Sequence, residues 1–179
     1  MTYLKLPRFI PFLVKGAFFI FIFFFLSNSL FAQNISVPEN IQAALLSKVL
    51  KYNPQIPKNQ KIKILVVYNK SSENNKDEFI EGLNNSLEIK AVYPNEIEQH
   101  IVNTHVVYFM AGIHDYAALC KKYNVLSVTG FSKDVEEGEV SLGFVIKNNK
   151  PIIVVNLNSL DKEEQSFSSD ILRISKIYK

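Results

Sequence analysis

The chain has little cysteine: Cys120 is the only one among 179 residues. A single thiol excludes an intrachain disulfide framework. Tyr116, Leu119, Cys120 and Tyr123 recur at helical spacing, which predicts that Cys120 lies on the buried stripe of a helix. A buried cysteine behaves as a small hydrophobic residue, and this is the interpretation we favour. A redox or intermolecular role for the unpaired thiol is the alternative.

The sequence also lacks the motifs that assemble chemistry. No two of its histidines (His100, His105 and His114) have the i, i+4 spacing of a helical metal pair. No glycine-rich nucleotide loop occurs, and no serine lies in a Gly-x-Ser-x-Gly elbow. Nothing in the sequence therefore predicts a cofactor, a metal centre or a set of catalytic residues, and we expect a protein that is not an enzyme.

The chain also lacks an excess of charge of one sign outside its N-terminal residues. Three of the 20 Lys and Arg residues, and none of the 17 Asp and Glu residues, lie within residues 1–32. The rest of the chain therefore carries 17 charges of each sign. Because nucleic-acid binding needs a basic surface, the composition argues against a nucleic-acid partner.

Residues 1–32 have the pattern of a secretory signal peptide. Basic residues precede the apolar run Gly16–Leu26, which small and polar residues follow. The run is 11 residues long, whereas a membrane-spanning helix needs about 20. We expect cleavage after Ser29 or Ala32 and a periplasmic protein formed by residues 33–179. An uncleaved signal that anchors the domain to the membrane is the alternative.

Apolar runs and amphipathic stretches alternate along residues 62–129. Strands are predicted over Ile62–Tyr68, Glu88–Tyr93, His105–Met110 and Val125–Thr129, of which the first and third are expected to be buried. Helices are predicted over Lys76–Leu87, Pro94–Ile101 and Asp115–Tyr123. Such alternation is typical of α/β proteins, so we predict a mixed, mostly parallel sheet flanked by helices.

The two ends of the domain follow different patterns. Near the C-terminus, Val140–Lys147 and Lys150–Val155 flank Asn148-Asn149, which predicts a β-hairpin, and Ser168–Tyr178 reads as a final helix. An opening helix is predicted before Pro54, and its core face consists of five residues: Ile41, Ala44, Leu45, Val49 and Tyr52.

One candidate site is a ligand crevice at the carboxyl ends of the parallel strands. Ligands of open α/β sheets bind at this edge. The candidate residues lie at the carboxyl ends of three predicted strands and are Tyr68, Asn69, Lys70, Gly112 and Gly130. This site would make the protein a periplasmic small-ligand binding protein.

The C-terminal half resembles a known family. The resemblance lies in five segments near the C-terminus: Gly138-Glu139-Val140, Leu142–Ile146, Pro151–Asn156, the step Val155-Asn156-Leu157, and Phe167–Ile174. In this order they resemble the end of the YfiR-like family of periplasmic proteins. The resemblance extends over Ile41 to Tyr178, because three earlier segments also match: Gln42–Leu46, Lys51–Asn53 and Leu126–Thr129.

The resemblance implies a compact α/β domain without catalytic residues that regulates a membrane-bound sensor, in some members a diguanylate cyclase, through protein contact. Family members with redox-tuned disulfide pairs differ from this chain, which has Cys120 alone. We therefore do not extend redox sensing to it. The predicted partner surface is formed by apolar residues left exposed on the first and last helices: Leu46, Leu50, Leu172 and Ile177.

Overall fold

The computed structural model describes residues 36–113 and 115–179. The predicted signal peptide, residues 1–32, lies outside the described residues. The helices are α2 (Glu39–Val49), α3 (Glu73–Gly82), α4 (Ile97–His100), α5 (Ala117–Tyr123), α6 (Ser132–Glu136), α7 (Leu157–Lys162) and α8 (Ser169–Ile174). The strands are β1 (Lys63–Val67), β2 (Glu88–Val92), β3 (Val106–Phe109), β4 (Leu126–Thr129), β5 (Leu142–Lys147), β6 (Lys150–Asn156) and β7 (Lys176–Tyr178).

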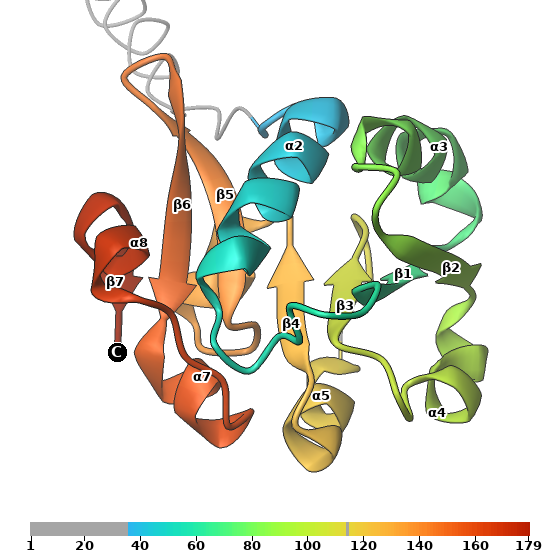
Figure 1. Cartoon of the computed structure of the whole chain (residues 1–179). Helices are drawn as coiled ribbons and strands as arrows, with labels where there is room; N and C mark the ends of the chain where they lie inside the picture. Colours follow the sequence, from blue (N-terminus) through green and yellow to red (C-terminus); the bar gives the residue numbers. More distant parts are fainter. Residues whose placement is uncertain (1–35, 114) are drawn as a thin grey trace, which may run out of the picture. The chain divides into compact units, whose positions relative to one another are not determined.

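The seven strands form one mixed sheet in the order β2-β1-β3-β4-β5-β6-β7 (Figure 1). Strands β1 to β5 are parallel to one another, β6 runs antiparallel to β5, and β7 runs parallel to β6. The first five strands have the doubly wound order 2-1-3-4-5. The prediction of a mostly parallel α/β sheet is confirmed.

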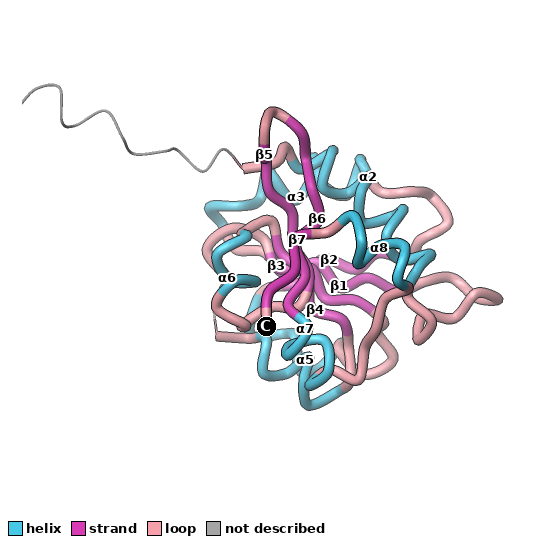
Figure 2. The backbone as a smooth tube through the Cα atoms, turned by 90° about the vertical axis from the view of Figure 1, so that its left-hand side faces the viewer, coloured by secondary structure: helices cyan, strands magenta, loops and turns pink. Residues whose placement is uncertain are grey.

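Each face of the sheet has its own apolar core because successive side chains of a strand point to opposite faces. Ile64 and Val66 of β1 join the core under α2, α3 and α8, whereas Leu65 and Val67 join the core under α4, α5 and α6. Figure 2 views the sheet from its β7 edge, with α8 and α6 on opposite sides of it. The central strands β1 (from Ile64 on) and β3 are apolar on both faces, as helices covering both faces require.

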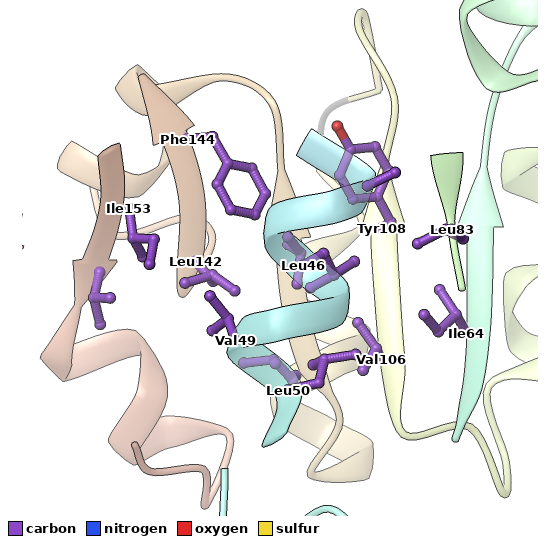
Figure 3. Close-up of a cluster of buried hydrophobic side chains, with 14 of the residues drawn as sticks. Leu46, Val49, Leu50, Ile64, Leu83, Val106, Tyr108, Leu142, Phe144 and Ile153 are labelled. Carbon is purple, nitrogen blue, oxygen red and sulfur yellow. The ribbon is translucent and has the colours of Figure 1, made fainter. Parts of the chain in front are cut away.

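Helix α2 packs across the centre of its face with Leu46, Val49 and Leu50 directed toward the strands (Figure 3). This face differs from the predicted one. Ile41 and Tyr52, which we expected in the core, are exposed, whereas Leu46 and Leu50, expected at the surface, are fully buried.

Asparagines end two elements where the sequence predicts it. Asn148 and Asn149 adopt positive φ angles of 51° and 58° between β5 and β6, as a two-residue type I′ hairpin requires. Asn124 has a φ of 55° and ends α5 in the left-handed conformation. The predicted hairpin is confirmed.

The C-terminal helix is shorter than predicted. Helix α8 ends at Ile174, and Lys176–Tyr178 forms β7 beside β6. Among residues 36–113 and 115–179, the structure contains no helix of the length and hydropathy that crossing a bilayer requires.

Candidate functional site

The carboxyl ends of β1, β3 and β4 meet at one edge of the sheet and place the predicted crevice residues there. The connection after β1 leads to β2 on one side, and the connection after β3 leads to β4 on the other side. The carboxyl ends of β1 and β3 are therefore the topological switch point of the fold. Asn69 follows β1 and Gly112 follows β3, and the Asn69 Nδ2 donates a hydrogen bond to the Gly112 carbonyl at 3.4 Å. The positive φ of 77° at Gly112 lets the backbone turn toward Asn69. The structure therefore brings these two predicted residues together.

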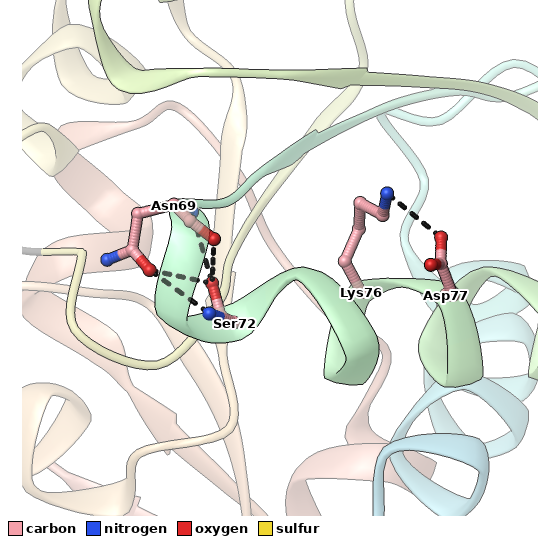
Figure 4. A network of polar contacts seen from close by, with 4 residues as sticks. All are labelled: Asn69, Ser72, Lys76 and Asp77. Carbon is pink, nitrogen blue, oxygen red and sulfur yellow. Dashed lines mark hydrogen bonds and ion pairs between the residues drawn. The ribbon is translucent and has the colours of Figure 1, made fainter.

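Asn69 makes most of its hydrogen bonds within its own loop (Figure 4). Its Oδ1 accepts hydrogen bonds from the backbone N–H groups of Ser71 at 3.0 Å and Ser72 at 3.1 Å. Both serine hydroxyls donate to the same oxygen. The Asn69 N–H in turn donates to the Ser72 hydroxyl, which completes a capping box at the start of the segment leading into α3. Asn69 thus fixes the loop after β1.

Two tyrosines lie beside this loop. The rings of Tyr68 and Tyr93 are 4.7 Å apart between centroids, and the Lys76 ammonium lies 4.5 Å from the Tyr68 centroid. A hydrogen bond to Tyr93 is the main cause that raises the pKa of Tyr68 above its ordinary value. Lys76 also pairs with Asp77 at 2.9 Å, which Figure 4 shows. Lys76 lies in the first turn of α3, and no sequence motif points to it. Lys70 is exposed.

Gly130 allows α2 to pack closely against the sheet. A methyl group at this position would come within 2.5 Å of the Gln42 Oε1. That oxygen accepts a hydrogen bond from the buried Tyr108 hydroxyl, and the Gln42 Nε2 donates to the Val37 carbonyl at 2.6 Å. The absence of a side chain at Gly130 therefore makes room for a buried polar link between α2 and β3. Apolar spacing did not predict a role for Gln42, because a polar residue at a core position interrupts the apolar stripe of α2.

The predicted partner surface is wrong in two of its residues. Leu46 and Leu50 belong to the core on the α2 side of the sheet and are inaccessible to a partner. Leu172 and Ile177 are half-buried and pack against the same core. Ile177 lies on β7 rather than on the last helix.

Other apolar side chains are exposed at the carboxyl edge. Ile41 is 40% exposed and Phe131 is 44% exposed. They are the chain neighbours of Gln42 and Gly130, which are in contact, so the two segments lie side by side. We call these two residues the Ile41–Phe131 edge. Val102, which is 57% exposed, precedes β3 and so lies at the opposite end of the strands.

A pocket of about 260 Å³ opens near the end of β3, on the face that α5 and α6 cover. Its apolar wall includes Phe109, Ile113 and Tyr116. Its acidic residues are Asp115, Asp134, Glu137 and Glu139. Within residues 36–113 and 115–179, no group of three or more His, Cys, Asp or Glu side chains is arranged to hold a metal ion.

The strand order, with its switch point between β1 and β3, defines a doubly wound α/β domain. The sequence profile of the YfiR/HmsC-like family matches residues 39–176, and the chain belongs to this family. The resemblance stated from the sequence is confirmed. No curated protein matches the chain by sequence.

Solved structures share the fold. One is the ABC domain from Streptococcus pneumoniae in complex with L-Trp, with a TM-score of 0.56 and 14% identity over 79% of this chain and 60% of that one. Another is a conserved domain protein from Vibrio cholerae O1 biovar eltor, with a TM-score of 0.55 and 14% identity over 82% of this chain and 61% of that one. The chain thus spans about three fifths of each structure. At this identity the likeness shows the fold alone.

Proposed function

We propose that this chain is an exported, non-enzymatic regulatory domain that modulates a membrane-bound sensor or cyclase by binding its periplasmic part. The observation that carries the proposal is the family match over residues 39–176, which includes nearly every described element. Export through residues 1–32, with cleavage after Ser29 or Ala32, would place the domain in the same compartment as such a partner.

The structure supports contact with a protein at the carboxyl edge of the sheet. The polar groups of Asn69 and Gln42 are occupied by internal hydrogen bonds, which stiffen this edge. Ile41 and Phe131 remain exposed on the stiffened edge. Protein interfaces are centred on such apolar and aromatic side chains, and a rigid surface loses little conformational entropy on binding. Regulation then follows if the domain binds one conformation of the sensor more tightly than another.

Deleting the gene and complementing it with surface variants tests the proposal. We expect deletion to change the output of a membrane sensor and the wild-type gene to restore it. The variant Ile41→Asp/Phe131→Asp should fail to restore the output although circular dichroism shows a folded domain. The control Val102→Asp adds one carboxylate at the other end of the strands, where Val102 is exposed, and should restore it. The proposal is overturned if deletion changes no output or if both variants complement equally.

A second candidate function is the binding of a small cationic molecule in the acidic pocket near the end of β3. Its volume of about 260 Å³ is slightly smaller than the volume of pockets that hold drug-sized ligands, roughly 300–1,000 Å³. Thermal unfolding with a panel of small organic amines distinguishes the candidates. A saturable rise in Tm that is lost in Glu139→Gln supports ligand binding, and no rise with any amine contradicts it.

A further inference from the structure

The side chain of Glu163, directly after α7, is completely buried. Its carboxylate accepts hydrogen bonds from the Ser127 backbone N–H at 3.1 Å, from the Ser127 hydroxyl, and from the Ser141 hydroxyl at 2.6 Å. The Ser127 hydroxyl also accepts from the Ser141 N–H at 2.9 Å, so both serines are fixed. None of the ion pairs among residues 36–113 and 115–179 includes Glu163. A buried carboxyl group that forms no ion pair is costly to ionise.

The groups that act on Glu163 come from each element packed against it. Strand β4 contributes Ser127, and Ser141 comes from the residue before β5; both are neutral. Helix α5 contributes the Cys120 thiol and the Lys121 ammonium. Burial raises the pKa of Glu163 to about 7, although the serine hydrogen bonds and Lys121 act in the opposite direction. Desolvation is therefore the largest effect on this group.

Glu163 lies in the middle of a segment that fastens the C-terminal part to the rest of the fold. Two residues later, Gln165 accepts a hydrogen bond from the Asn53 side chain at 2.9 Å and donates one to the Asn124 carbonyl at 2.9 Å. The Ser168 N–H donates to the Tyr52 carbonyl at 2.9 Å. Residues 157–168 thus connect β6 to α8 while holding the chain after α2 and after α5. We call residues 157–168 the C-terminal latch.

We propose that Glu163 makes the C-terminal latch responsive to pH, so that the latch is closed most tightly when the carboxyl group is protonated and opens more easily as the pH rises. The sign follows from linkage. The carboxyl group has a pKa near 4.5 when it is exposed and near 7 when the latch is closed, so closing takes up a proton between these values. Between pH 4.5 and 8, the opening equilibrium constant should increase on the order of a hundredfold.

Hydrogen exchange of the full-length protein tests the proposal. Amide exchange of peptides from residues 157–168 is measured between pH 5 and 8 and corrected for the intrinsic rate at each pH. Three proteins are compared: the wild type, Glu163→Gln, and the control Glu164→Gln, which changes the exposed neighbouring carboxylate. In the wild type and the control, we expect the opening equilibrium constant of the latch to be on the order of a hundredfold larger at pH 8 than at pH 5. The Glu163→Gln latch should open equally at both ends of the range.

Two outcomes would overturn the proposal: opening of the wild-type latch that does not depend on pH, or the same pH dependence in Glu163→Gln. If Glu163→Gln does not fold, Ser141→Ala provides the test. It removes one hydrogen bond to the ionised carboxylate, so the midpoint of the pH dependence should move to higher pH. A midpoint equal to that of the wild type contradicts the proposal.

Discussion

Replacing Tyr108 by phenylalanine tests how α2 is held on the sheet. Tyr108 lies in β3 and is fully buried, and its hydroxyl donates to the Gln42 Oε1. Burial raises the pKa of Tyr108 far above its ordinary value, so the hydroxyl remains a donor throughout the working range of pH. The substitution deletes this donor and leaves a buried amide oxygen without its partner.

The expected cost follows from what is lost and what is kept. An unpaired buried acceptor costs about 1–3 kcal/mol. The ring of Tyr108 stacks on Phe79 with centroids 3.8 Å apart, and phenylalanine preserves this contact. The free energy of unfolding should therefore fall by about 1–3 kcal/mol, without the larger loss that removing an aromatic ring causes.

Urea unfolding measures this change as a lower midpoint at an unchanged slope. Tyr93→Phe is the matched control because Tyr93 is exposed, and its effect should stay within about 0.5 kcal/mol. If Tyr108→Phe also stays within about 0.5 kcal/mol, the hydroxyl does not stabilise the contact between α2 and β3, and the reasoning is refuted.

Two further predictions concern buried side chains. Leu46→Ala should lower the free energy of unfolding by about 2–5 kcal/mol, whereas Ile41→Ala on the same helix should change it by less than about 0.5 kcal/mol; equal effects in urea unfolding would contradict the assignment of the α2 faces. Burial raises the pKa of the Cys120 thiol well above its ordinary value, and the thiol should therefore resist alkylation until the domain unfolds. Cys120→Ala should cost on the order of 1 kcal/mol. Rapid labelling of the native protein, followed by mass spectrometry, would contradict the buried position.

The parallel sheet could be predicted because its strands are short apolar runs separated by amphipathic stretches. Local conformational preferences also marked the turn at Asn148-Asn149 and the end of α5 at Asn124. Because parallel strands bring their carboxyl ends to one edge, the proximity of Asn69 and Gly112 followed from the strand order as well.

The buried face of α2 could not be predicted from apolar spacing. Gln42 occupies a core position because it links Tyr108 to Val37, and this polar residue conceals the stripe that Leu46, Val49 and Leu50 continue. The apolar residues Ile41 and Leu45 suggested a different stripe. Two of the four predicted partner-surface residues were therefore placed on the wrong side of the helix.

The C-terminal region depends on contacts between distant segments. Lys176–Tyr178 forms a strand because it pairs with Val154–Asn156, and nothing in its local sequence distinguishes it from the end of a helix. Helix α6 was not predicted, and the acidic run that begins at Asp134 lies largely within it. Helix α7 was not predicted; the Asn156 side chain begins it by accepting from the Ser159 N–H at 3.0 Å.

We propose that the domain acts by contacting a membrane protein through the Ile41–Phe131 edge. Photo-crosslinking in intact cells tests it most directly, with a photoreactive residue at position 131 in one protein and at position 102 in the other. We expect position 131 to capture a membrane sensor, identified by mass spectrometry, and position 102 to capture none. Capture of no membrane protein from position 131, or equal capture from both positions, would contradict it.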